Sequence, residues 1–185
     1  MPKTKGNGPT WSDVKSVLAG MDRNQLVQLA GDLYRLSKDN RDFFHVRFAV
    51  AKDPLEPYKK TIEQCMYPNV LRDKPIQIVK AKTAVIAYSK AGGDPLGEAE
   101  LMTFFVECGN SFTIHYGDIN EEFYYALNLM YSRAIEKVLG LPPEQQGEFR
   151  ERLKDIMTSA DGIGWGYYDE LRSDFYKAFS DEKEG

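Results

Sequence analysis

The segment Asp161-Gly-Ile-Gly-Trp-Gly-Tyr-Tyr-Asp169 contains the residue types with the clearest potential for chemistry. Its carboxylates, Asp161 and Asp169, can act as general bases, and Trp165 and Tyr168 can stack on a ligand ring. The alternate glycines do not form a dinucleotide fingerprint, because a helix rather than a strand is predicted before them. The segment is therefore either an aromatic and acidic ligand pocket or a close helix packing filled by aromatics. For Trp165 itself we expect a core position.

Two lysines, Lys80 and Lys82, are candidate contacts for an anion. They lie in the run Ile76–Tyr88, which is rich in β-branched residues, but its length of 13 and its alanines favour a helix over a buried strand. On that helix Lys82 is expected in the middle of the apolar face. A lysine there must snorkel, pair with a carboxylate or lose its charge, or else it faces an anionic ligand in a groove.

The remaining polar clusters have simpler structural explanations. Asp118 is expected to cap a helix, with Glu121 at its third position. A metal site formed by Asp118, Asn120, Glu121 and Glu122 with His115 would lack the loop of a calcium site and the paired histidines of a zinc helix. His45 and His115 are 70 residues apart and fit no triad signature. We expect no metal and no cofactor.

Two segments resemble a family of uncharacterised bacterial proteins. They are Phe105-Val-Glu-Cys-Gly-Asn-Ser-Phe-Thr-Ile-His-Tyr-Gly-Asp-Ile119, followed by Phe123-Tyr124, and Ile163-Gly-Trp-Gly-Tyr-Tyr-Asp169. The similarity includes the N-terminal leucine-rich helices, so it spans most of the folded chain. Position 168 is Tyr where the family has His, so no histidine mechanism at that position is carried over. The resemblance implies a single bacterial helical domain and no particular activity.

An all-α fold is predicted from helix caps and apolar periodicity. Helix starts are marked by Asp22 with Gln25 three residues later, and by Asp53-Pro54 and Asp94-Pro95, which lie 41 residues apart. A stripe of Leu26, Leu29, Leu33 and Leu36 is typical of a core-facing helix. The helices are expected at 12–19, 22–36, 40–50, 53–66, 76–91, 94–116 (which could break near Gly109), 119–139, 141–159 and 165–179. Antiparallel pairs at this period are typical of a HEAT-like short α-solenoid, and an irregular helical bundle is the alternative.

Composition and charge indicate one folded domain. The chain of 185 residues is 42% hydrophobic and 28% charged, within the globular range. Residues 1–9 are expected to form a disordered arm, 10–179 a single helical domain, and 180–185 a disordered tail. No apolar run approaches a membrane span, and two cysteines without a CxxC spacing fit reduced thiols, so a cytoplasmic protein without a membrane partner is expected.

Charge divides unevenly along the chain. Residues 1–90 carry 16 Lys and Arg against 9 Asp and Glu, while residues 91–185 carry 8 against 19. The two halves can therefore attract each other or present surfaces to charged partners. Nucleic acid is the less favoured partner, because the overall balance is acidic. The lysines and arginine that would contact it gather in one stretch: Lys59, Lys60, Arg72, Lys74, Lys80 and Lys90.

Two functions remain open. The favoured one is a non-catalytic module that binds a macromolecule, most simply another protein, because no catalytic signature is assembled. The alternative is an enzyme acting on an anionic substrate such as a nucleotide or nucleic acid, with Lys80 and Lys82 as anion contacts. In that case Asp161 or Asp169 would be the general base beside Trp165 and Tyr168. Only the enzyme requires these groups to converge in one pocket.

Overall fold

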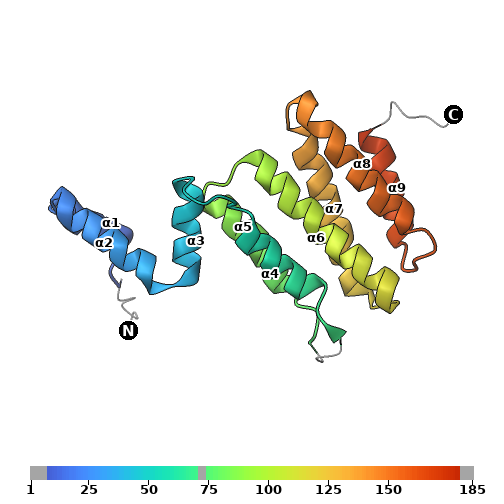
Figure 1. The fold of residues 1–185 in the computed structure, drawn as a ribbon, viewed down its shortest axis with the longest axis horizontal. Helices are drawn as coiled ribbons and strands as arrows, with labels where there is room; N and C mark the ends of the chain where they lie inside the picture. The colour runs from blue at the N-terminus through green and yellow to red at the C-terminus, as the bar shows by residue number, and fades with distance from the viewer. Residues whose placement is uncertain (1–7, 71–73, 180–185) are drawn as a thin grey trace, which may run out of the picture. The chain divides into compact units, whose positions relative to one another are not determined.

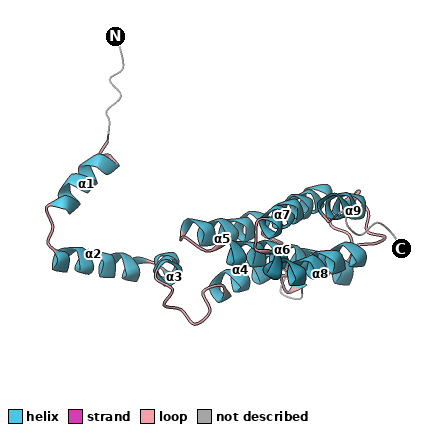
Figure 2. Cartoon of the chain, turned by 90° about the horizontal axis from the view of Figure 1, so that it is seen from above, coloured by secondary structure: helices cyan, strands magenta, loops and turns pink. Residues whose placement is uncertain are grey.

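The computed structural model describes residues 8–70 and 74–179. Within them, the secondary-structure elements longer than one residue are all α-helices (Figures 1 and 2). The all-α class is therefore confirmed. The helices are α1 (Trp11–Ala19), α2 (Arg23–Leu36), α3 (Lys38–Arg47), α4 (Glu56–Met66), α5 (Ile78–Lys90), α6 (Pro95–Tyr116), α7 (Glu121–Leu139), α8 (Pro143–Ser159) and α9 (Tyr167–Ala178).

The chain divides into two compact units, Met1–Phe44 and His45–Gly185, with the boundary inside α3. The single domain expected over residues 10–179 stays a prediction, and each unit is described by itself. Of the expected N-terminal arm, residues 8 and 9 are exposed and have no regular structure, and the rest lies outside the described residues. The expected tail over residues 180–185 also lies outside them.

Unit 1 has well-formed helix caps but no buried side chain among its described residues. The predicted capping box is confirmed: the Gln25 amide donates to Asp22 Oδ1, and the Asp22 amide donates to Gln25 Oε1, both at 2.9 Å. The predicted core-facing stripe of α2 is wrong for unit 1 by itself. Leu26, Leu33 and Leu36 are 41%, 45% and 76% exposed and Leu29 is half-buried, because no element of the unit packs closely along this face.

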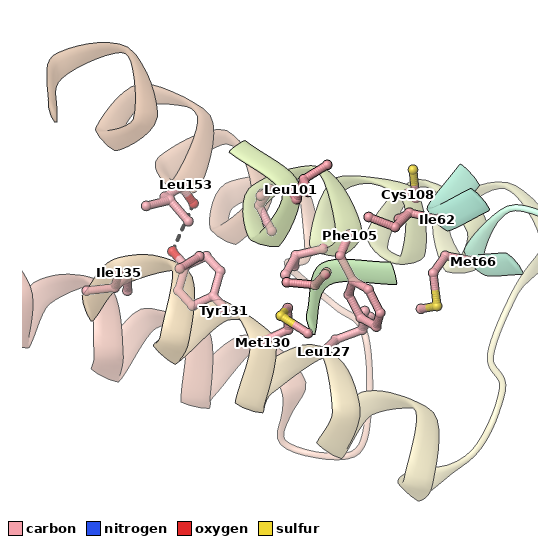
Figure 3. Packing of buried hydrophobic residues seen from close by; sticks show 14 of the residues in the cluster. Ile62, Met66, Leu101, Phe105, Cys108, Leu127, Met130, Tyr131, Ile135 and Leu153 are labelled. Carbon is pink, nitrogen blue, oxygen red and sulfur yellow. Dashed lines mark hydrogen bonds between the residues drawn. The ribbon is translucent and has the colours of Figure 1, made fainter. Parts of the chain in front are cut away.

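Unit 2 contains the hydrophobic core, and α6 lies at its centre in contact with α4, α5, α7 and α8. Figure 3 shows Phe105 of α6 among Leu127, Met130 and Tyr131 of α7. The Tyr131 hydroxyl donates to the carbonyl of Leu153 at 2.9 Å, so the only polar atom of the Tyr131 side chain is paired within the core. The predicted packing in helix pairs is confirmed, and the HEAT-like superhelix stays a prediction.

The two Asp-Pro signals act differently. Asp94 caps α6 as predicted, with Pro95 in its first turn and the Gly97 amide 2.8 Å from Asp94 Oδ1. Asp53 instead accepts from the Leu55 and Glu56 amides ahead of α4, which begins at Glu56. The helix start predicted at Asp53 was therefore early by about one turn, because this aspartate forms a turn that leads into the helix.

The helix α6 continues through Gly109 without the break that this residue could have caused. Gly109 lies against the side chain of Leu127 in α7, where a Cβ atom would collide with it. The glycine therefore allows two core helices to approach closely.

Ion pairs tie three helices of unit 2 together, one of them between the basic and acidic halves of the sequence and the others within the acidic half. Lys59 of α4 contacts Glu100 of α6 at 2.6 Å. The guanidinium of Arg152 in α8 binds Glu100 and also binds Glu107, with Nε 2.7 Å from Glu107 Oε1. Ion pairs therefore hold α4, α6 and α8 together, and the pair of Lys59 with Glu100 uses part of the charge asymmetry.

Candidate functional site: a groove beside the Asp118–Trp165 contact

A hydrogen bond connects the two segments that the sequence analysis singled out. Trp165 Nε1 donates to Asp118 Oδ2 at 2.7 Å across 47 positions of sequence. The other oxygen, Oδ1, accepts from the Tyr124 hydroxyl at 2.6 Å, and the Thr113 hydroxyl lies 2.6 Å from that of Tyr124. This contact ties the loop between α6 and α7 to the loop between α8 and α9.

The electrostatics of this contact suit structure better than catalysis. The hydrogen bonds from Tyr124 and Trp165 lower the pKa of Asp118, so the carboxylate is stabilised as an anion and is a weak base. Burial, followed by the hydrogen bond to Asp118, raises the pKa of Tyr124 and keeps its hydroxyl protonated. Neither group is prepared to exchange a proton near neutral pH.

The expected role of Asp118 as a helix cap is wrong. The residue that caps α7 is Asn120, whose Oδ1 accepts from the Phe123 amide at 2.9 Å. Asp118 lies two residues earlier, after Gly117 has turned the chain with a φ of +91°. This turn directs Asp118 to the distant indole.

The core position expected for Trp165 is also wrong. Its side chain is 54% exposed, and its φ of +62° is in the left-handed region, which is costly for a residue with a Cβ atom. The neighbouring Tyr167 is completely buried instead and packs against Tyr124, with ring centroids 5.2 Å apart. The bond to Asp118 and the burial of Tyr167 hold Trp165 in this conformation.

An open groove of about 700 Å³ lies next to this contact, between the start of α5 and the start of α7. We call it the α5–α7 groove. Its apolar lining consists of Ile76, Ile78, Val79, Ile119 and Phe123, and its polar lining of Gln77, Lys80, Thr83, Asn120 and Glu122.

Local hydrogen bonds fix both walls of the groove. On the α5 side, the Gln77 amide donates to the carbonyl of Cys65 at 3.0 Å, which ties the start of α5 to the end of α4. On the α7 side, the Asn120 cap and the Asp118–Trp165 contact hold the loop that carries Ile119. Between the walls, Phe123 is buried whereas Val79 is 79% exposed. The groove therefore has a fixed apolar floor and an accessible apolar rim.

The other candidate residues do not gather at this groove. Lys80 lines it, but Lys82 is half-buried beside the packed face of α5 and does not line it. The expected position of Lys82 in the middle of the apolar face is wrong. The buried positions of α5 are Ala81, Ala84, Val85 and Tyr88. The small alanines pack inward, and Val79 faces outward.

The acidic candidates lie on another part of unit 2. Asp161 is exposed in the loop after α8, and Asp169 is exposed in the first turn of α9. Tyr168 is half-buried and packs against the core. Because α5 packs on α4 and α6 whereas α9 packs on α7 and α8, α5, which carries the lysines, and α9, which carries Asp169 and follows the loop with Asp161, lie on different sides of the unit (Figure 1).

A second polar contact lies near the end of α6, and no sequence pattern predicts it. The Tyr67 hydroxyl lies 3.1 Å from His115 Nδ1, and the ring of Tyr67 also packs edge-to-face against Phe112. No local spacing connects Tyr67 with His115, 48 positions later. Only the aromatic content of the residues 112–116 could have marked the region.

A second groove, of about 600 Å³, has an acidic lining in which several carboxylates already have structural partners. Asp53 and Asp94 bind helix-start amides, and Glu100 binds Lys59 and Arg152. These partners account for much of the acidic character by helix capping and core ion pairing.

No family model, no curated protein and no solved structure matches the chain. The resemblance to an uncharacterised bacterial family therefore stays a prediction. Within residues 8–70 and 74–179, no helix has the length and apolar content to cross a bilayer. In the same residues, no cluster of three or more His, Cys, Asp or Glu side chains is placed to hold a metal ion.

Proposed function

We propose that the protein is a non-catalytic binding module that engages another protein through the α5–α7 groove. The observation that carries this proposal is an open, preformed groove with an apolar floor. Among its described lining residues, one is a cation, Lys80, and one is an anion, Glu122. Small-molecule sites enclose most of their ligand, whereas recognition surfaces for protein segments are open and amphipathic.

The chemistry of the groove defines the partner. Its apolar side chains suit a segment that presents aliphatic or aromatic residues, such as one face of an amphipathic helix. Lys80 favours an acidic residue on the α5 side of that segment, and Glu122 favours a basic residue on the α7 side. The exposed Val79 would lose a large share of its apolar surface on binding, which makes it a strong candidate for a dominant contact.

The distribution of the candidate residues disfavours the enzyme alternative. An acid–base mechanism on an anionic substrate needs Lys80 or Lys82 near Asp161 or Asp169. The lysines lie on α5, whereas the aspartates lie on α9 and in the loop before it, and α5 and α9 pack on different helices of unit 2. The best-positioned carboxylate, Asp118, is committed to Tyr124 and Trp165. We therefore do not propose catalysis.

The proposal can be tested by affinity purification from native cells followed by quantitative mass spectrometry. Val79→Glu places a charge at the apolar rim. The matched control is Leu139→Glu, an exposed apolar residue at the opposite end of α7, 16 residues or roughly 24 Å of helix from Phe123. We expect the same co-purifying proteins for the wild type and Leu139→Glu, and loss of one or more of them for Val79→Glu. Identical sets for all three forms, with both variants folded, would overturn the proposal.

A further inference from the structure

Unit 1 presents two apolar helix faces that are covered only in part: Leu18 and Leu29 are half-buried, and the other apolar side chains along them are exposed. The helices α1 and α2 contain no buried residue, although both are capped and amphipathic. Their lengths of 9 and 14 residues are at or below what forms a stable isolated helix in water, about 12–15 residues. Helices of this length need a packing surface.

The spacing of the apolar residues indicates what kind of surface that is. On α2, Leu26, Leu29, Leu33 and Leu36 follow one another at intervals of three, four and three residues, and on α1, Trp11, Val14 and Leu18 follow at three and four. Alternating intervals of three and four residues place side chains on the seam of a coiled coil. We call these residues the unit 1 seam.

We propose that the unit 1 seam binds a second copy of this chain, with α2 packed against α2 and the seams of α1 extending the contact. The α2 seam is self-complementary in an antiparallel register: Leu26 lies opposite Leu36 of the second copy, and Leu29 lies opposite Leu33. Every leucine then meets a leucine, as a two-fold interface requires. This surface lies in a different unit from the α5–α7 groove and does not depend on it.

Charge allows this occupant, and the area that a stable dimer needs determines how much of unit 1 must take part. The seam positions are all uncharged, and the charged residues of α1 and α2 lie off the seam, so two copies can approach without like charges meeting on it. A stable interface needs roughly 800 Å² from each partner, more than one 14-residue helix supplies. Both helices must therefore take part, and α1 adds Trp11 and Val14, which are 69% and 46% exposed.

The test is the mass of the full chain in solution, measured by light scattering and sedimentation from low micromolar to submillimolar concentration. We expect the wild type to reach twice the chain mass of 21.1 kDa. Leu33→Asp, on the seam, should remain monomeric over the same range. Val27→Asp should dimerise like the wild type, because Val27 is 65% exposed on α2 but lies off the seam.

Folding of the variants can be checked separately, because none of the described residues of unit 1 belongs to the core cluster of unit 2. Both variants should retain the thermal transition of that core. A wild type that stays monomeric at every concentration would overturn the proposal. This holds also if hydrogen exchange shows that α2 is protected in the monomer, because the seam would then be covered by the same chain. Equal loss of the dimer in Leu33→Asp and Val27→Asp would also overturn it.

Discussion

Replacing Arg152 should destabilise the folded protein through the two carboxylates that would lose their cation. The Arg152 guanidinium binds Glu107 through Nε at 2.7 Å and Nη2 at 2.9 Å, and it also binds Glu100. In Arg152→Met, Glu100 would retain its ion pair with Lys59. Glu107 would instead face the uncharged methionine, and its negative charge would no longer be compensated there. Methionine keeps much of the apolar stem, so the change mainly removes the charge.

The expected cost follows from burial. Removing one partner from a fully buried ion pair costs about 3–5 kcal/mol. The side chains of Arg152, Glu100 and Glu107 retain 22%, 17% and 30% exposure. Because water partly screens these charges, we expect Arg152→Met to lower the free energy of unfolding by about 2–3 kcal/mol. For a protein of this size this corresponds to a fall in Tm of roughly 4–12 °C. Arg133→Met is the matched control, because Arg133 is exposed on α7, and it should change stability by at most about 0.5 kcal/mol.

The stability that Arg152→Met loses should also depend on pH. Burial raises the pKa of Glu100, but the hydrogen bonds and charges of Arg152 and Lys59 lower it further, so the folded-state pKa lies below the ordinary value of 4.5. A lowered folded-state pKa stabilises the fold above the unfolded-state pKa, and this contribution disappears as pH falls through the folded-state value. Thermal melts followed by circular dichroism should show the full difference between Arg152→Met and wild type near pH 7. The difference should be smaller at about pH 4. A difference below about 1 kcal/mol near neutrality, or an equal one at both pH values, would refute the reasoning.

Three further predictions concern single residues of unit 2. Gly109→Ala should destabilise the protein by about 1–3 kcal/mol in a thermal melt, because the added Cβ would collide with Leu127. The control Gly147→Ala, in open space on α8, should stabilise the protein by about 0.5–1 kcal/mol. The opposite order of stabilities would contradict the assigned packing. Trp165→Gly should be about 1 kcal/mol more stable than Trp165→Ala, because only glycine adopts a φ of +62° without strain, and equal melts would contradict this. Burial raises the pKa of Cys108 to about 12, so peptide mass spectrometry should find slow alkylation of this thiol in the folded protein and fast alkylation in denaturant.

The helices could be predicted from sequence because their signals are local. The reciprocal bonds of Asp22 and Gln25, and the cap formed by Asp94 before Pro95, lie within one turn of the helix that they start. Burial is not local. The leucines of α2 have the spacing of a core-facing stripe, but their exposure depends on what packs against them, and periodicity alone does not contain that information.

The candidate site could be predicted only in parts. The segments around Asp118 and Trp165 were both singled out, but the bond between them spans 47 positions and has no local signature. Trp165 was misplaced because a tryptophan among glycines usually fills a core, whereas here the left-handed turn at positions 165 and 166 buries Tyr167 instead. Lys80, predicted as an anion contact, lines the α5–α7 groove, but the groove is mainly apolar and the anion contact stays a prediction.

Site-specific photo-crosslinking in native cells tests the central claim most directly. A photoreactive amino acid at Val79 would report what occupies the α5–α7 groove, and the same group at Leu139 would report non-specific encounters. The proposed function predicts a discrete adduct with one other protein from position 79 that is absent from position 139. Adducts of equal yield at both positions, no protein adduct at position 79, or an adduct with nucleic acid there would contradict it.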